Sequence, residues 1–328
     1  MPKVSVIIPN YNHARFLRKR IDSALQQTFQ NFEMILLDDC STDDSRSILS
    51  SYAADPRVTI EFNDANSGST FKQWNKGVRL ARGEYVWIAE SDDYADPRFL
   101  ERLVAVLDGD PQVVFAYCRS WRVSANDELD GYADYYLADI DPHRWTADYF
   151  ADGVEECRNY FVRITPVPNA SAVVFRKALY DQVGGADESF RMCGDWKLWA
   201  AMALIGKVAY LGEPLNYFRF HRAIAGSKAE KTRLDVAEML RVVSWILSRV
   251  TPSQAVLDEV YAFQSEHWVP IVMSMHFPRS LKRIILGSVR EIDPHPIRSA
   301  IRPVLATVRR KLLRHWHALV PRATSETL

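Results

Sequence analysis

Short apolar runs alternate with amphipathic helical segments through the first third of the chain. Five runs rich in β-branched and aromatic residues have the length and composition of strands, at 3–9, 32–39, 57–62, 84–90 and 112–118. Four segments between them carry apolar residues at helical spacing, at 13–28, 41–53, 69–83 and 96–110. This alternation predicts βαβ crossovers and an α/β fold with a mostly parallel central sheet flanked by helices.

Polar and acidic residues follow three of these expected strands. The first strand is followed by "PNYN", the second by Asp38 and Asp39, and the fourth by "ESDD" at 90–93. In parallel sheets, ligands bind at the carboxyl ends of the strands. We therefore expect the three segments to form a single site.

The "ESDD" segment places three carboxylates within four residues, at Glu90, Asp92 and Asp93. A hard divalent cation such as Mg²⁺ or Mn²⁺ takes one or two carboxylates and is often completed by substrate phosphates. The segment therefore predicts a metal site that is completed by a diphosphate. The alternative is that these residues cap the next helix and remain in water.

Asp38 and Asp39 end the second expected strand in the same way, and the same alternative applies to them. If the ligand is a nucleotide, a carboxylate here can accept the imino N–H of uracil or thymine, or the N–H groups of guanine. Cytosine has no ring N–H and would be a poor partner.

The second half of the chain has weaker periodicity. Residues 127–165 are rich in aromatic and acidic side chains without a clear period, and we expect a long, partly ordered excursion. The stretch "GDWKLWAAMALIG" predicts a helix from about Asp195, and the pattern beyond Ser227 is mainly helical. Between Arg279 and Arg322 eleven Lys or Arg residues outnumber two acidic residues, so this part is basic.

Composition limits the possible classes of protein. The chain has 328 residues, 48% hydrophobic, with 41 basic and 41 acidic side chains, which excludes a disordered chain and a protein that is basic throughout. We expect no nucleic-acid partner. Four scattered cysteines without a CxxC pair favour reduced thiols, and there is no apolar run of about 18 residues, so we expect a cytoplasmic protein.

Three segments in fixed order carry a resemblance to a known family. They are "VSVIIPNYNHARFLRKRIDSALQQTFQNFEMILLDDCSTDDS", "NSGSTFKQWNKGVRLARGEYVWIAESDD" and "GDWKLW". Together they resemble a family 2 glycosyltransferase with the GT-A fold over roughly residues 3–222. The resemblance implies an inverting enzyme that moves a sugar from a nucleotide diphosphate to a glycan or lipid-linked acceptor with Mg²⁺ or Mn²⁺, in bacterial cell-surface polysaccharide synthesis.

The resemblance also implies roles for individual donor-site residues. Pro9 and Tyr11 would border the nucleoside, and Asp39 would bind the base. Asp92 would approach the ribose and the metal, and Asp93 would be a direct metal ligand.

Two further roles follow from the later motifs. Asp195 in "GDW" matches the family's catalytic base, and His221 matches a histidine that faces the diphosphate. The chain departs from the family at Glu90, where an Asp is frequent, and at Gly194, where most members have an acid. Asp195 could instead cap its helix, and His221 could be a structural histidine.

Other classes of protein are less compatible with the sequence. A dinucleotide-dependent dehydrogenase would need GxGxxG after the first strand, where "PNYNHARF" stands. A sugar-nucleotide pyrophosphorylase would need a loop rich in glycine and arginine there. A catalytically inactive nucleotide-sugar-binding or scaffold protein of the same fold is the remaining alternative.

We predict a catalytic domain over 1–225, with nucleotide-sugar binding in 1–118 and the acceptor and catalytic part in 119–225. A helical, basic region would then follow over 226–328. Residues 300–322 set apolar side chains among Arg and Lys, which predicts a peripheral contact with an anionic membrane. The alternative is that this apolar face packs on the catalytic domain.

Overall fold

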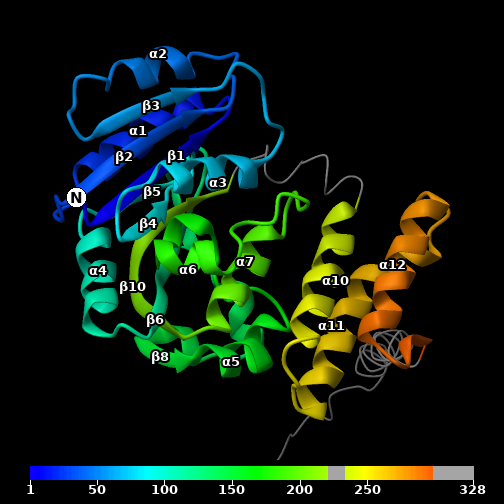
Figure 1. Cartoon of the computed structure of the whole chain (residues 1–328). Coiled ribbons are helices and arrows are strands. Elements are labelled where there is room, and N and C mark those ends of the chain that lie inside the picture. Colours follow the sequence, from blue (N-terminus) through cyan, green and yellow to red (C-terminus); the bar gives the residue numbers. More distant parts are fainter. Residues whose placement is uncertain (221–232, 298–328) are drawn as a thin grey trace, which may run out of the picture. The chain divides into compact units, whose positions relative to one another are not determined.

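The computed structural model describes residues 1–220 and 233–297 (Figure 1). Within these residues one sheet contains ten strands. They are β1 (Val4–Asn10), β2 (Phe32–Asp38), β3 (Val58–Phe62), β4 (Tyr85–Ile88), β5 (Tyr94–Ala95), β6 (Val113–Val123), β7 (Leu129–Tyr132), β8 (Tyr149–Asp152), β9 (Val173–Arg176) and β10 (Lys207–Arg219).

Helices separate the strands of the first half, as the sequence predicts. The α-helices of the described residues are α1 (Ala14–Leu25), α2 (Ser45–Ser50), α3 (Thr70–Leu80), α4 (Phe99–Gly109), α5 (Gly153–Glu156), α6 (Lys177–Gln182), α7 (Gly194–Ala203), α10 (Leu234–Leu247), α11 (Gln254–Met273) and α12 (Arg279–Ile292). Four further helical turns, of the 3₁₀ or π type, are η1 (Tyr135–Asp139), η2 (Arg144–Thr146), η3 (Cys157–Phe161) and η4 (Ala170–Ala172).

The strand order is β3-β2-β1-β4-β9-β6-β10-β5, with β7 paired to β6 and β8 to β10. Strands β1 to β4 pair in parallel, as do β6 and β10. Strand β9 lies antiparallel between β4 and β6, and β5, β7 and β8 are also antiparallel to their partners. The prediction of an α/β fold with a central sheet flanked by helices is confirmed; the sheet is mixed, with parallel pairing among β1 to β4 and between β6 and β10.

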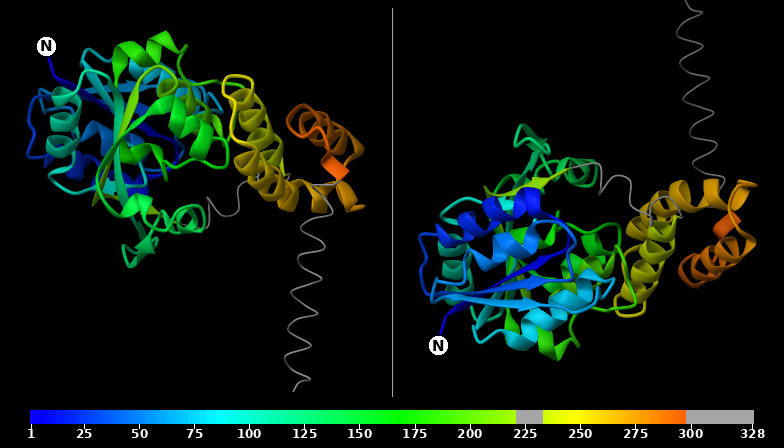
Figure 2. Two further views of the ribbon diagram at one scale, coloured as in Figure 1. Left: turned by 90° about the horizontal axis from the view of Figure 1, so that it is seen from below. Right: turned by 90° about the horizontal axis from the view of Figure 1, so that it is seen from above.

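Successive side chains of β1 enter two different cores. Val4, Val6 and Ile8 pack in one buried cluster with residues of α1, α2 and α4. Ile7 points to the other face, where a Cβ added to Gly77 of α3 would lie 2.4 Å from its side chain. Figure 2 shows helices on both faces of this sheet. A sheet covered on both faces explains why its central strands are apolar throughout rather than alternating.

Residues 127–165 differ from the expected partly ordered excursion, because they fold into short elements over β6 and β10. The Tyr117 and Tyr149 hydroxyls lie 2.6 Å apart, and Trp145 Nε1 donates to the Tyr117 oxygen at 3.1 Å. The Arg144 guanidinium lies 4.1 Å from the Tyr149 ring centroid and pairs with the buried Glu156 carboxylate. The aromatic residues of this segment, which follow no helical or strand periodicity in the sequence, therefore make tertiary contacts.

The chain divides into two compact units, Met1–Glu238 and Met239–Leu328. In the second unit α12 packs against α11 and buries one face, formed by Leu281, Ile285, Val289 and Ile292. The prediction of a mainly helical C-terminal region is confirmed for its described residues. None of the described helices is both long and apolar enough to span a membrane.

Several predictions fall outside the described residues. The predicted domain boundary after residue 225, His221 and the basic segment 300–322 all lie there. They remain predictions from the sequence, as does the division of the catalytic domain at residue 118.

Candidate active site

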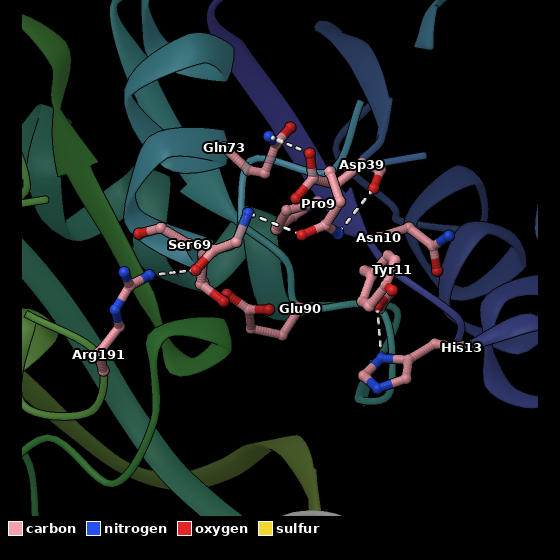
Figure 3. Close-up of a pocket in the computed structure, with 13 residues that line it drawn as sticks. Pro9, Asn10, Tyr11, His13, Asp39, Ser69, Gln73, Glu90 and Arg191 are labelled. Atoms are coloured by element: carbon pink, nitrogen blue, oxygen red, sulfur yellow. Dashed lines mark hydrogen bonds between the residues drawn. The ribbon is translucent and has the colours of Figure 1, made fainter. Parts of the chain in front are cut away.

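A cavity of about 390 Å³ opens at the carboxyl ends of β1, β2 and β4 (Figure 3). Its walls come from the turns after these three strands, from the start of α3, and from Arg191 before α7. The lining residues are Pro9, Asn10, Tyr11, His13, Asp39, Asn66, Gly68, Ser69, Thr70, Gln73, Glu90, Ser91 and Arg191. The structure therefore brings together the three strand-end segments that the sequence predicts to form one site.

The Asp39 carboxylate is fixed in the wall of this cavity by four hydrogen bonds. Its Oδ1 accepts from Asn63 Nδ2 at 2.7 Å, from the Ser67 backbone N–H at 2.8 Å and from Gln73 Nε2 at 2.9 Å. Its Oδ2 accepts from Ser67 Oγ at 2.8 Å. The donors lie in loops and in α3, 24 to 34 residues further along the chain. An oriented carboxylate with a free lone pair on Oδ2 can accept a further N–H.

Asp38 has a structural role, which distinguishes it from its neighbour. It is fully buried, and its two oxygens accept from Asn10 Nδ2 at 3.0 Å and from the Ser41 backbone N–H at 3.0 Å. These bonds join the ends of β1 and β2. Of the two acids at this strand end, Asp39 is the one that lines the cavity.

The turn between β1 and α1 presents Tyr11 to the cavity. Tyr11 is 47% exposed, and the following Asn12 has a φ of 57°, a conformation that Asn tolerates better than most residues. Asn12 Oδ1 accepts the Thr42 backbone N–H at 2.8 Å, which holds the turn. His13 Nδ1 lies 2.8 Å from Ser91 Oγ and joins this turn to the one after β4.

The acid cluster after β4 is crowded and mostly buried. Burial and the nearby Asp92 raise the pKa of Glu90 to about 8, although Trp74 Nε1 donates to its Oε1 at 2.7 Å. Burial and Asp92 likewise raise the pKa of Asp93 to about 7. Both shifts show that negative charge in this cluster is costly for the folded protein, and a cation bound there would reduce that cost.

Asp93 is directed into the protein rather than into the cavity. Its side chain is 2% exposed; Oδ2 accepts from Asn169 Nδ2 at 2.6 Å, and Oδ1 from the Arg219 backbone N–H at 2.9 Å. Arg219 Nε also donates to the Asp92 carbonyl at 2.7 Å, so the end of β10 holds the whole segment. Neither Asp92 nor Asp93 lines the cavity, whereas Glu90 does.

The donor set of this cluster suits a hard divalent cation, because it consists of carboxylate oxygens. Asp93 also has a hydrogen bond with the Ser171 side chain, beside those from Asn169 and Arg219. Among the residues that the structure describes, no group of three or more His, Cys, Asp or Glu side chains could hold a metal ion. A cation here would need ligands from a bound diphosphate.

Arg20 places a buried positive charge beneath the acid cluster. Its Nε donates to the Glu90 carbonyl at 2.9 Å, and its guanidinium lies 4.9 Å from the Trp87 ring centroid. Burial lowers its pKa to about 10, so it remains a cation at neutral pH, and its charge partly balances Asp92 and Asp93.

Asp195 lies in the first turn of α7, four residues beyond Arg191. Its Oδ1 accepts the backbone N–H of Trp196 at 2.8 Å, and burial raises its pKa to about 6. The N-cap position of α7 is occupied by Cys193, so Asp195 is not the N-cap residue. It does not line the cavity, but the loop that leads to it does, through Arg191.

Arg191 contributes a positive charge to the cavity that the sequence motifs did not predict. Its Nη1 donates to the Gly68 carbonyl, and in Figure 3 Arg191 and His13 lie on opposite sides of Glu90. The only signal in the sequence is an Arg three residues before the "GDW" motif. The loop between α6 and α7 has no periodicity from which its direction could be predicted.

The motif tryptophans and Asn75 are structural. Trp196 is 3% exposed and donates from Nε1 to the Phe161 carbonyl at 2.9 Å, so its ring is part of the core. Trp199 is fully buried. Asn75 Oδ1 accepts from the Tyr180 hydroxyl at 2.6 Å and from the Ala186 backbone N–H at 3.0 Å, and thereby ties α3 to the loop before α7.

Comparison with known proteins agrees with this architecture. Residues 5–164 match the sequence model of Glycosyl transferase family 2. An uncharacterised glycosyltransferase of Nostoc sp. is 30% identical over 230 residues, which are 67% of this chain and 66% of that protein. The chain thus spans slightly less than two thirds of that relative.

Two solved structures show the same fold. Residues 1–349 of S. aureus TarS, in complex with UDP-GlcNAc, align with a TM-score of 0.69 and 18% identity over 94% of this chain and 88% of that one. A mannosyltransferase of Pyrobaculum calidifontis, in complex with GDP-Man and Mn²⁺, aligns with a TM-score of 0.54 and 17% identity over 97% and 80%. The two structures show that the chain has the GT-A fold, and the family match identifies residues 5–164 as a glycosyl transferase family 2 domain.

Proposed function

We propose that this protein is an inverting glycosyltransferase that uses a UDP-, dTDP- or GDP-sugar and a glycan or lipid-linked acceptor. The observation that carries the proposal is the cavity at the ends of β1, β2 and β4, with the fixed Asp39 carboxylate in one wall and Arg191 in another. A nucleoside diphosphate presents a base with an N–H at one end and negative charge at the other. The Asp39 wall can accept the N–H of the base, and the Arg191 wall can bind the negatively charged diphosphate.

Asp39 recognises the base in this proposal, with Pro9 and Tyr11 beside the nucleoside. Asp39 accepts the imino N–H of uracil or thymine, or the N–H groups of guanine, at its Oδ2. Arg191 binds the diphosphate, because a guanidinium donates two parallel N–H groups to phosphate oxygens. The family resemblance also assigns His221 a role at the diphosphate.

Asp92 and Asp93 hold a Mg²⁺ or Mn²⁺ ion in this proposal, with Glu90 beside them. When bound, such an ion would neutralise the negative charge that the diphosphate gains as it leaves. The raised pKa values of Glu90 and Asp93 support a cation at this position. The mannosyltransferase that shares the fold was solved with Mn²⁺.

Asp195 is the general base. The acceptor oxygen forms a bond to the anomeric carbon on the face opposite the diphosphate, while the bond from that carbon to the diphosphate oxygen breaks. Asp195 takes the acceptor's hydroxyl proton, and the diphosphate leaves with the bonding electron pair. A carboxylate with a pKa of about 6 is ionised at neutral pH and is a stronger base than an ordinary Asp.

The proposed product is a cell-surface polymer in a bacterium. TarS of Staphylococcus aureus, a poly(ribitol-phosphate) β-N-acetylglucosaminyltransferase, is 34% identical to this chain over 110 residues, or 33% of this chain and 19% of TarS. The likeness makes UDP-GlcNAc the first donor to test. A membrane contact through 300–322 would bring the enzyme to a lipid-linked acceptor.

A thermal-shift screen with UDP, dTDP, GDP and CDP tests the donor site, each with Mn²⁺ and with excess chelator. A ligand at 100 times its Kd stabilises the native state by about 2.7 kcal/mol. We expect at least one of the first three to raise the melting temperature, more with Mn²⁺, and CDP to have little effect. A shift with CDP alone would contradict the role of Asp39.

Release of nucleoside diphosphate from a panel of donor sugars, starting with UDP-GlcNAc, separates the enzyme from an inactive binding protein. Turnover with a donor that also gives a thermal shift supports the proposed enzyme. Binding without turnover across the donor and acceptor panel would instead support the inactive alternative.

A further inference from the structure

Three consecutive backbone N–H groups before α7 converge on one carboxylate from a distant part of the chain. Glu238 Oε1 accepts from the Arg191 N–H at 2.8 Å. Glu238 Oε2 accepts from the N–H groups of Met192 and Cys193 at 2.8 and 3.0 Å. Glu238 lies 47 residues after Arg191, in α10, and is 6% exposed.

The physical reason for this arrangement is the start of α7. The first N–H groups of a helix have no partner within it, and the N-terminal end carries a partial positive charge. Cys193 is the N-cap residue of α7, and its side chain makes no capping hydrogen bond. Glu238 supplies an acceptor from another element for one of these groups, the Cys193 N–H, and it also accepts from the two N–H groups of the loop before the helix. These are charge-assisted hydrogen bonds, which are stronger than those between neutral groups.

The loop that Glu238 holds leads into α7, and the two segments together carry two residues with roles in the proposed reaction. Arg191 lines the cavity and contacts the Gly68 carbonyl, and Asp195 follows within the first turn of α7. We propose that Glu238 is a positioning residue. Its single carboxylate fixes the positions of Arg191, which binds the diphosphate, and of the base Asp195. This inference rests on the proposed function, which gives those two residues their roles.

Glu238 also acts on Asp195 through its charge. After burial, which is the larger cause, the negative charge of Glu238 raises the pKa of Asp195. Two other titratable groups interact with Asp195, the Cys193 thiol on its own loop and the Tyr136 hydroxyl of η1. Both are neutral at pH 7, because burial raises the pKa of each, so Glu238 is the charged member of this group.

The test compares Glu238→Gln with wild type in two assays. Gln keeps the shape, but only one of its two terminal atoms accepts a hydrogen bond, so the loop loses acceptors. We expect affinity for UDP to fall about tenfold, the low end of the effect of a charge-assisted hydrogen bond, and affinity for uridine to stay unchanged. Uridine lacks the diphosphate that Arg191 binds.

The second assay is the pH dependence of UDP release from UDP-GlcNAc. Displacement of Asp195 predicts a loss of turnover of up to about 100-fold. Removal of a negative charge makes Asp195 easier to ionise, so its pKa falls and the acid limb of the profile moves to lower pH. Glu238→Asp, which keeps the charge, should leave the acid limb near its wild-type position, and this variant serves if Glu238→Gln does not fold.

Glu84→Gln is the matched control, because Glu84 is half-exposed and pairs with Lys3 at the opposite end of β4. It should match wild type in both assays. If Glu238→Gln changes neither the ratio of UDP to uridine affinity nor the acid limb, and loses turnover only as thermal stability falls, Glu238 is merely a helix cap and the inference is wrong.

Arg191→Gln and Asp195→Asn in the same assays separate this inference from the proposed function. If Arg191→Gln binds UDP like wild type, or Asp195→Asn keeps its turnover, the assigned roles are wrong whatever Glu238 does. If those variants behave as proposed and Glu238→Gln behaves like wild type, the inference about Glu238 alone is overturned.

Discussion

A Cβ atom added to Gly194 would lie 2.6 Å from the ring of Phe71, a distance that side-chain carbons do not adopt. Gly194 directly precedes Asp195, at the position where the family resemblance leads us to expect an acid. In this chain Phe71 of α3 occupies the space that such a side chain needs. The glycine at this position is therefore matched by its surroundings.

This contact predicts the effect of Gly194→Ala. Overpacking of a filled core costs about 1–3 kcal/mol, so the free energy of unfolding should fall by that amount. Gly109→Ala at the end of α4 is the control, because a Cβ there meets nothing within 4 Å. Phe71→Leu combined with Gly194→Ala should recover part of the loss in denaturant unfolding; equal stability of the two alanine variants would contradict the contact.

Replacement of Asp39 by Ala should weaken donor binding. Loss of a charge-assisted hydrogen bond to the base corresponds to about 1.5–3 kcal/mol in the free energy of UDP binding. Titration calorimetry with UDP measures this change. Ser67→Ala removes one donor to Asp39 Oδ2 but leaves the carboxylate, so it should cost less than Asp39→Ala. UDP affinity equal to wild type in Asp39→Ala would refute the assignment.

Removal of the metal and replacement of its proposed ligand Asp93 should both abolish turnover. We expect Asp93→Ala to abolish Mn²⁺- or Mg²⁺-dependent turnover and to weaken UDP binding, and excess chelator to do the same to wild type. Asp92→Ala should also be damaging. Asp93 also bonds Asn169 and Arg219, so the thermal stability of each variant must be measured. Full activity of wild type in chelator would exclude a metal role.

Turnover should depend on pH through Asp195. A base acts only when ionised, so with a pKa of about 6 the rate should fall as pH drops below 6. At pH 5 it should be about tenfold below its plateau. Asp195→Asn cannot take the proton and should lose 10²- to 10⁴-fold at neutral pH, with UDP affinity retained. If the acid limb persists in Asp195→Asn, the titrating group lies elsewhere.

The basic segment at 300–322 predicts membrane binding that depends on lipid charge. We expect the full chain to cosediment with vesicles of anionic phosphatidylglycerol, less at high salt, and poorly with zwitterionic phosphatidylcholine. A chain that lacks 300–328 should lose this binding. Equal binding of the two proteins would favour the alternative, in which the apolar face packs on the catalytic domain.

The sequence by itself determined the α/β class and the location of the site. Apolar periodicity is local, and the carboxyl ends of parallel strands lie at one edge whatever the loops do, so "PNYN", Asp39 and Glu90 could be brought together without coordinates. The family motifs added Asp195. None of these inferences needed a contact between distant residues.

Only the tertiary structure decided which atoms of the site are exposed and how they are held. Asp93 turns toward Asn169 and Arg219, which lie 76 and 126 residues away, and Arg191 reaches Gly68 across 123 residues. Such contacts depend on how loops without periodicity cross the sheet. A local pattern carries no information about these crossings, because the packing of the whole domain selects them.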